Sequence, residues 1–122
     1  MILLIAGSRD FTDYEWLSEV VTQVLSETID EVTVLSGTAR GADQLGERFA
    51  EERGLEIIRC PAEWERYGKS AGYKRNLVMA KVATHAIIFW DGESRGTRHM
   101  INLCTDTGVK LRVINTNQKG TQ

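Results

Sequence analysis

Residues 2–9 read ILLIAGSR, and this segment points most directly to the fold, because five consecutive apolar residues run straight into a short polar segment that contains a glycine. An unbroken apolar run is typical of a strand that is covered on both faces, as in the centre of a parallel sheet. The same arrangement returns in VTVLSGTARGAD at residues 32–43 and in AIIFWDGESRGT at residues 86–97. We therefore expect buried parallel strands that are followed by glycine-containing polar loops.

Segments with helical periodicity separate the strands. Thr12 and Glu15 have the spacing of a capping box, and the apolar residues after them recur at intervals of three and four. Gly54 and Gly108 are placed to end two later helices, and Ser70 is placed to cap the helix between them. The first expected helix follows Thr12, and three more cover residues 42–53, 71–82 and 94–105. The expected strands cover residues 2–6, 32–35, 55–59, 86–90 and 109–114.

One connection has no regular pattern. Pro61 opens it, and it runs through Trp64 and Tyr67 to the helix expected after Ser70. Loops of this length often carry function, so we expect part of the site there.

The alternation of strands and helices predicts a single α/β domain with a Rossmann-like, three-layer architecture. We expect a mainly parallel five-stranded sheet with helices on both faces. The 122 residues suit one domain, which we place at residues 1–114, followed by a polar C-terminal tail at residues 115–122. With 42% hydrophobic and 26% charged residues, the composition is that of a soluble globular domain.

Several classes of protein are disfavoured. The net charge of -2 argues against coating nucleic acid through overall charge. The longest apolar run is far shorter than the roughly 20 residues of a membrane span, so we expect a cytoplasmic protein with no membrane partner. Cys60 and Cys104 are isolated, and His85 and His99 are not spaced as a metal pair, so no metal site is expected. The motifs GxGxxG and GxxxxGK[ST] are absent, which disfavours an ordinary dinucleotide fingerprint and a triphosphate P-loop.

The loops after the strands are the expected ligand site, because open parallel sheets bind ligands beyond the carboxyl ends of their strands. Glycines there let the backbone approach a ligand, and the N-terminus of a following helix attracts phosphate. The candidate ligand-binding residues are Gly7, Ser8, Arg9, Ser36, Gly37, Arg40, Gly41, Asp43, Lys69, Arg75, Asn76, Asp91, Gly92, Ser94, Gly96 and Thr97. Together they predict a site for a phosphorylated ligand.

Aromatic and acidic side chains accompany these loops. Phe11, Trp64 and Trp90 are candidates for stacking on a base. Asp43 and Asp91 are the carboxylates expected nearest to the ligand, where either could hold a ribose hydroxyl or act as a general acid or base. With Arg75, these two carboxylates form the candidate catalytic set.

Four segments together resemble the YspA-like branch of the SLOG superfamily, and the resemblance covers nearly the whole chain. Relatives in that superfamily include the LOG cytokinin-activating phosphoribohydrolases, the YpsA proteins and the DNA-processing protein A domain. The segments are Gly7-Ser8-Arg9 with Phe11 and Tyr14, Ser36-Gly37 with Arg40-Gly41-Ala42-Asp43, Pro61-Ala62 and Trp64 with Tyr67 to Gly72 and Arg75-Asn76, and Phe89 to Gly92 with Ser94 and Gly96-Thr97. The resemblance implies a Rossmann-like sheet that binds a nucleotide or nucleotide-derived ligand, with Gly96 and Thr97 in the phosphate loop. It also implies a link to NAD- or ADP-ribose-derived signals in conflicts between bacteria and phages.

The phosphate loop departs from the LOG pattern PGGxGTxxE. In LOG enzymes an Arg on the preceding helix works with that Glu to cleave the bond between base and ribose, and Arg75 matches this Arg in position. Met100 stands where the Glu would be, and the leading PGG is missing. Because cleavage of an N-glycosidic bond needs a carboxylate, this departure favours binding over hydrolysis.

We therefore expect a sensor, carrier or sequestering protein for a purine nucleotide or an ADP-ribose- or NAD-like molecule, with no cofactor required beyond a bound nucleotide. One alternative is a LOG-type nucleotide-ribose hydrolase or transferase. Another is a single-stranded nucleic-acid-binding module that uses Arg66, Lys69, Lys74 and Arg75. The resemblance also implies a homodimer or a larger homo-oligomer.

Overall fold

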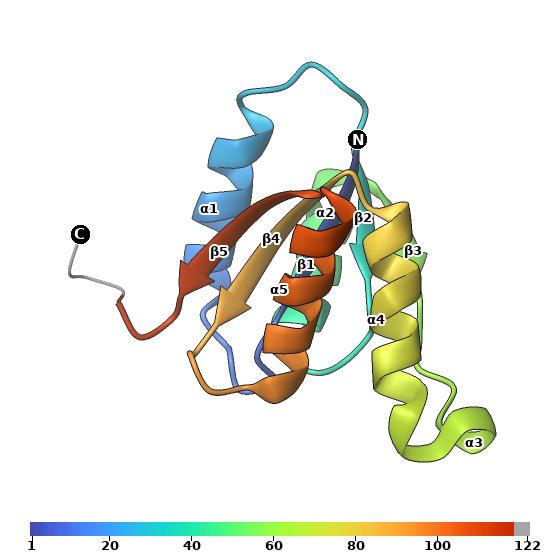
Figure 1. Cartoon of the computed structure of the whole chain (residues 1–122). Coiled ribbons are helices and arrows are strands. Elements are labelled where there is room, and N and C mark those ends of the chain that lie inside the picture. The colour runs from blue at the N-terminus through green and yellow to red at the C-terminus, as the bar shows by residue number, and fades with distance from the viewer. Residues whose placement is uncertain (119–122) are drawn as a thin grey trace.

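The fold is a single five-stranded sheet in which every pair of neighbouring strands is parallel (Figure 1). The structure is a computed structural model, and it describes residues 1–118. The strands are β1 (Ile2–Gly7), β2 (Thr33–Ser36), β3 (Glu56–Arg59), β4 (His85–Trp90) and β5 (Lys110–Asn115). Their order is β3-β2-β1-β4-β5, so the chain moves outward from β1 to β3 and then crosses back to β4. The direction of winding thus reverses between β1 and β4, which is where such sheets bind ligands.

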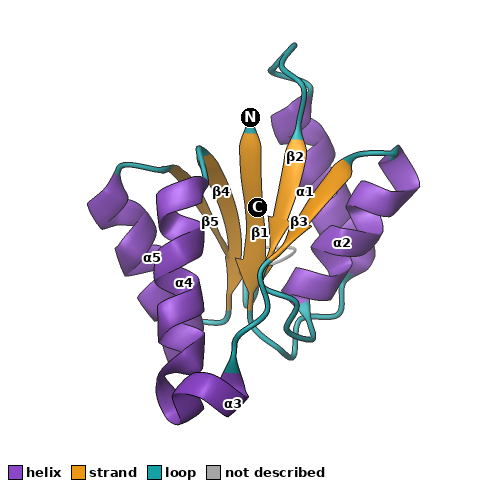
Figure 2. Ribbon diagram, turned by 90° about the vertical axis from the view of Figure 1, so that its right-hand side faces the viewer, coloured by secondary structure: helices purple, strands orange, loops and turns teal. Residues whose placement is uncertain are grey.

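Helices cover both faces of the sheet (Figure 2). The helices α1 (Tyr14–Leu25) and α2 (Ala42–Arg53) pack on one face, while α4 (Ala71–Val82) and α5 (Arg95–Thr107) pack on the other. The predicted three-layer α/β domain with a parallel five-stranded sheet is therefore confirmed. No helix within residues 1–118 is both long enough and apolar enough to cross a bilayer.

The central strand explains the unbroken apolar run in the sequence. Leu3 and Ile5 of β1 contact the core beneath α1 and α2, whereas Leu4 contacts the core beneath α4 and α5. All three side chains are 0% exposed. Because successive residues of a strand point to opposite faces, only a strand with helices on both sides needs every position apolar.

The connection after β3 is more regular than predicted. It contains the short helix α3 (Trp64–Tyr67) and a 3-10 turn, η1 (Gly68–Ser70), which leads directly into α4. The prediction of irregular structure was wrong, because a four-residue helix is too short to display an apolar period. Ser70 also does not cap α4 with its side chain, since its hydroxyl donates to the carbonyl of Tyr67.

Other boundaries moved by one or two residues. The predicted capping box at Thr12 and Glu15 was wrong, because Asp13 caps α1 by accepting a hydrogen bond from the Trp16 backbone N–H at 3.0 Å. The bounds predicted for α2 and α4 are confirmed, while β2 and α5 begin one residue later than predicted. Two competing capping residues stood side by side at positions 12 and 13, and the sequence pattern did not separate them.

The predicted tail at residues 115–122 is tied to the sheet at its start. Asn115 is the last residue of β5, and the side chain of Asn117 donates to the carbonyl of Asp91 at 2.6 Å. The remainder of the predicted tail, residues 119–122, lies outside the described residues. Asn117 therefore contacts the loop after β4 and is not free.

Candidate functional site

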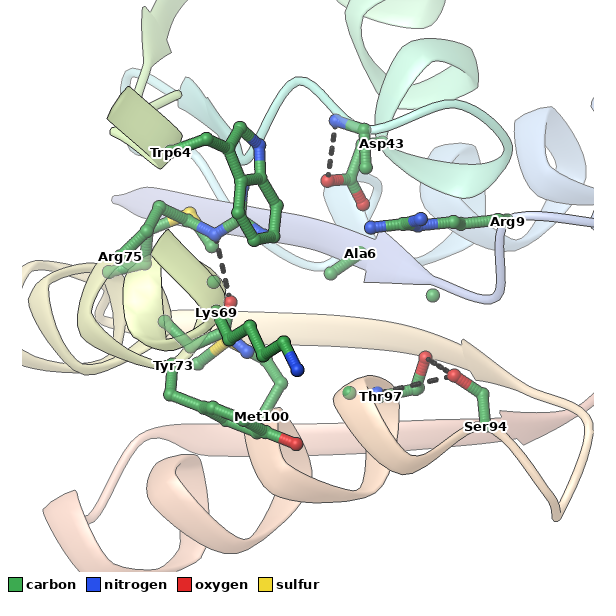
Figure 3. Close-up of a pocket in the computed structure, with 16 residues that line it drawn as sticks. Ala6, Arg9, Asp43, Trp64, Lys69, Tyr73, Arg75, Ser94, Thr97 and Met100 are labelled. Atoms are coloured by element: carbon green, nitrogen blue, oxygen red, sulfur yellow. Dashed lines mark hydrogen bonds between the residues drawn. The ribbon is translucent and has the colours of Figure 1, made fainter. Parts of the chain in front are cut away.

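A cavity of about 250 Å³, here the first cavity, lies between the carboxyl end of β1, the helix α4 and the first turn of α5 (Figure 3). Segments from five places in the sequence meet there. The predicted residues that line it are Gly7, Arg9, Asp43, Trp64, Lys69, Arg75, Asn76, Ser94, Gly96 and Thr97. The fold thus brings together residues from the loops after β1, β2 and β4 and from the connection after β3.

Sequence reasoning missed other lining residues, which are Ala6, Ala39, Gly72, Tyr73, Met79 and Met100. A helical signal could have found several of them. Gly72 and Tyr73 lie three and four residues after Lys69, and Asn76 follows at the next turn, so all four share one face of η1 and α4. Met100 lies one turn beyond Gly96 on α5. The small residues Ala6 and Ala39 carry no such signal.

A second cavity of about 320 Å³ adjoins the first. It is enclosed by the loop after β2 and by the connection after β3, and its walls include the predicted residues Gly37 and Arg40. Four residues line both cavities: Arg9, Ala39, Trp64 and Arg75. The two hollows therefore meet along a border made of these four residues.

Asp43 is the acidic group of the first cavity. Asp43 is only 5% exposed, and one of its carboxylate oxygens, Oδ2, accepts a hydrogen bond from the Ala39 backbone N–H at 3.2 Å. Burial raises the pKa of Asp43 to about 6, although the Ala39 N–H and the positive charge of Arg75 oppose the shift. The carboxyl group can therefore exchange its proton near neutral pH.

Arg75 is held in place by two neighbours. Its Nη1 donates to the carbonyl of Gly37, and its Nε donates to Oδ1 of Asn76 at 2.9 Å. The Asn76 amide lies 3.4 Å from Nδ1 of His99, whose ring packs edge-on against Tyr73. Burial lowers the pKa of His99, so its ring is neutral at physiological pH. This series of contacts fixes the Arg75 guanidinium at the border of the two cavities.

The loop after β2 is held in place by hydrogen bonds to buried side chains. Ser36 is fully buried, and its hydroxyl donates to Glu47 at 2.6 Å while accepting from the Thr38 backbone N–H at 3.0 Å. Arg59 in turn donates to Glu47 at 2.7 Å. Thr38 has a φ of 67°, an unfavourable conformation for a residue with a branched Cβ. Ser36 was predicted to touch a ligand, but the structure uses its hydroxyl to hold this loop.

Two predicted glycines serve packing between loops. At Gly41, where φ is 83°, a Cβ atom would lie 2.4 Å from the carbonyl oxygen of Ser8. At Gly7, a Cβ atom would lie 2.3 Å from the carbonyl oxygen of Phe89. Both positions let the loops after β1, β2 and β4 approach one another, and Gly7 also lines the first cavity.

Asp91 and Ser8 lie away from the first cavity, beside a separate hollow of about 300 Å³. Asp91 Oδ1 accepts the backbone N–H groups of Glu93 and Ser94, both at 2.8 Å. These hydrogen bonds lower the pKa of Asp91 below its usual range. Asp91 therefore forms the turn before α5 as a carboxylate, a turn that Gly92 completes with a φ of 84°.

Two of the three aromatic candidates do not face the first cavity. Phe11 is only 7% exposed and stacks on Phe89 with ring centroids 4.8 Å apart, so it belongs to the core. Trp90 donates its indole N–H to the carbonyl of Ser94 at 3.1 Å, which positions the start of α5. Trp64, in contrast, is 52% exposed and lies on the border of both cavities.

The first cavity is predominantly cationic. Arg9, Lys69 and Arg75 line it, against the single carboxylate of Asp43. Within residues 1–118 the ion pairs join Arg48 and Arg59 to glutamates, and none involves the cations of the cavity. Among the same residues, no group of three or more acidic, His or Cys side chains is arranged to hold a metal ion.

The first turn of α5 forms one end of this cavity. Ser94 caps the helix, with its hydroxyl 2.9 Å from the Thr97 hydroxyl. A Cβ atom at Gly96 would meet nothing within 4 Å, so the helix end opens into space. Because the N-terminal end of a helix carries partial positive charge, it adds to the attraction of the cations for an anion.

The sequence profile of the YspA, cpYpsA-related SLOG family matches residues 1–67. The chain belongs to this SLOG family. It is also similar to the Gene 61 protein of Mycobacterium phage D29, at 32% identity over 115 residues that cover 89% of this chain and 92% of that protein. No solved structure matches. The profile match spans the SLOG chain from β1 to the end of α3, which includes Arg9, Gly37, Asp43 and Trp64, and the sequence-based resemblance is confirmed.

Proposed function

We propose that this SLOG protein binds the phosphate of a nucleotide or nucleotide-derived molecule in the first cavity and acts as a sensor, carrier or sequestering protein. One observation carries the proposal: Arg9, Lys69 and Arg75 line a cavity that is closed at one end by the N-terminal turn of α5. Arginine and lysine side chains bind phosphate through charge-assisted hydrogen bonds, and a helix N-terminus adds backbone donors.

The rest of the first cavity suits the other parts of a nucleotide. Met79 and Met100 provide apolar walls, and Tyr73 and Trp64 provide partly exposed rings. Small-molecule sites typically combine apolar walls with a few polar groups that fix orientation. Asn76, which also lines the first cavity, offers such a polar group.

The experiment incubates the purified protein with AMP, ADP-ribose, cyclic ADP-ribose, NAD and other purine ribonucleoside monophosphates, and identifies retained and altered species by mass spectrometry. Retention of an intact species is the expected result. Gly96→Val should abolish retention without unfolding the protein, because the added side chain enters open space at the helix end. Asn102→Val places the same residue at an exposed position of α5 and is the matched control.

Retention by Gly96→Val equal to that of the wild type would contradict the phosphate site. If no nucleotide is retained by the wild type, the proposed function itself is wrong. Circular dichroism and thermal unfolding of both variants establish that the fold is intact before binding is compared.

A second candidate function is hydrolysis or transfer at a nucleotide ribose, and the arrangement of Asp43 and Arg75 favours it. In hydrolysis, water would attack the anomeric carbon, the bond to the base would break, and the base would leave with a proton. Asp43, with a pKa of about 6, can accept or donate a proton near neutral pH. The same mass spectra test this candidate, since a released base or sugar phosphate must vanish in both Arg75→Ala and Asp43→Asn.

A further inference from the structure

The second cavity is not needed for the phosphate placed at α5, yet it shares four lining residues with the first cavity. Trp64 and Arg75, which line both, lie on the same side of the first cavity in Figure 3. Ligand pockets usually have volumes of about 300 to 1,000 Å³. The first cavity, at about 250 Å³, falls below that range, whereas the two cavities together fall within it. A ligand that fills only the first would leave the adjoining space to water.

The charge of the second cavity is one-sided. Arg9, Arg40 and Arg75 line it, and its walls within the described chain include no acidic side chain. No hydrogen bond or ion pair joins Arg9 or Arg40 to another residue of that part. Two free guanidinium groups beside a third are a strong attraction for phosphate, whose oxygens match the planar arginine fork.

Two backbone N–H groups of the loop after β2 are already used inside the protein. The Thr38 N–H points to the hydroxyl of Ser36, and the Ala39 N–H points to the carboxylate of Asp43. Both groups are therefore satisfied inside the protein. The guanidinium groups of Arg9 and Arg40 are donors available to a ligand, and Arg40 lies in this fixed loop beside the second cavity.

We propose that the two cavities form one continuous ligand site, and that the second cavity receives a second phosphate group of the same nucleotide. This inference rests on the proposed function, because it assumes that the first phosphate-containing half lies in the first cavity. Arg40 carries the argument, since it lines only the second cavity and an uncharged arm would leave it without a counter-charge. The ligand class is therefore a nucleotide with two phosphate groups.

Three probes test the proposal by calorimetry: AMP, ADP and adenosine 3′,5′-bisphosphate. ADP carries its second phosphate on the first, and the bisphosphate carries it on the ribose, so the comparison also shows which attachment fits. At least one of the two should bind about tenfold or more tightly than AMP, as expected for added charge-assisted hydrogen bonds. Arg40→Ala should remove this gain and leave the affinity for AMP within about twofold.

A second variant and a control complete the experiment. Ala62→Phe fills the second cavity from a half-buried loop position and should weaken the binding of the two-phosphate probe but not that of AMP. Arg112→Ala removes the same charge from exposed β5, at the opposite edge of the sheet, and should alter none of the affinities. This control separates a local effect of Arg40 from a change in net charge.

The outcomes separate the two proposals. Equal affinity for all three probes, or an equal loss for AMP and the two-phosphate probe in Arg40→Ala, overturns the second subsite. If AMP binding is then still abolished by Gly96→Val, the proposed function stands alone. If none of the three probes binds the wild type, the second subsite is overturned, whereas the proposed function is overturned only if ADP-ribose, cyclic ADP-ribose and NAD are not retained either.

Discussion

Asp43 and Arg75 meet over Gly37, where an added Cβ atom would lie 2.8 Å from Oδ2 of Asp43 and 3.0 Å from Nη1 of Arg75. The carboxylate comes from α2, the guanidinium comes from α4, and the glycine lies directly after β2. Because no side chain stands at position 37, opposite charges from two faces of the sheet share this space. The acid–base state of Asp43 is therefore coupled to the cationic border of the two cavities.

Gly37→Ala tests this relationship. The added methyl group must displace the ends of two side chains and not the backbone, so we expect the fold to survive at a cost of about 1 to 3 kcal/mol. The displaced Arg75 should lower the affinity for AMP by about tenfold, which corresponds to one lost charge-assisted hydrogen bond. Calorimetry measures the affinity and chemical denaturation measures the stability. Unchanged affinity in a folded Gly37→Ala protein would show that Arg75 does not bind the phosphate.

Asp43→Asn should change how stability depends on pH. In the folded protein the pKa of Asp43 is raised to about 6, from an ordinary value of 3.8. Its protonated form is thus favoured by folding, and the associated stability is complete below pH 3.8 and lost as the pH rises through about 6. The total is about 3 kcal/mol, because one pKa unit corresponds to 1.36 kcal/mol.

Urea denaturation at pH 4.5 and pH 7.5 measures the effect. The free energy of unfolding of Asp43→Asn, relative to that of the wild type, should increase between these two values. Other carboxyl groups titrate in both proteins, so the difference isolates Asp43. A constant difference across this range would contradict the raised pKa.

The sheet was predictable because burial on both faces leaves a direct mark on the sequence. Continuous apolar runs marked β1 and β4, and Gly54 marked the end of α2. The failures came from short-range competition. Asp13 displaced Thr12 as the cap of α1, and α3 was too short to have a period.

The site was predictable only in part. The sequence pattern places a residue near the carboxyl ends of the strands, but it does not determine the direction in which the side chain points. Asp43 and Asp91 looked equivalent in the sequence, each next to a glycine-containing loop. In the structure, Asp43 lines the first cavity, whereas Asp91 accepts hydrogen bonds from the backbone N–H groups of its own turn. The choice depended on which loop packs against α4, and that contact is a property of the whole fold.

Phe11→Leu distinguishes a core aromatic from a base-stacking one. Phe11 packs between Phe89 and Trp16, with centroid distances of 4.8 Å and 6.0 Å. Loss of these ring contacts should reduce the free energy of unfolding by about 1 to 2 kcal/mol. The affinity for AMP should not change, because Phe11 lies outside both proposed cavities. Denaturation and calorimetry on one preparation measure the free energy of unfolding and the affinity for AMP. Weaker AMP binding by a folded variant would show that Phe11 belongs to the binding site.

The affinity for an anion should rise as the pH falls through about 6. Above that value the carboxylate of Asp43 is ionised and repels a phosphate in the first cavity, and below it the group is neutral. ADP-ribose is the suitable probe, because both of its phosphates are esterified and keep the same charge over this range, whereas the phosphate of AMP gains a proton near pH 6. Burial lowers the pKa of His99, and hydrogen bonding lowers the pKa of Asp91.

Between pH 7.5 and pH 5, the dissociation constant of ADP-ribose should therefore fall by about tenfold, an interaction of roughly 1.4 kcal/mol between the carboxylate and the phosphate. Asp43→Asn removes the titrating charge, so its affinity should be flat over the same range and close to that of the wild type at pH 5. The dependence of the affinity on pH is more informative than the affinity at any single pH, because a substitution that only disturbed the cavity would lower the affinity at every pH. A wild-type profile retained in Asp43→Asn would mean that another group controls the binding of the anion.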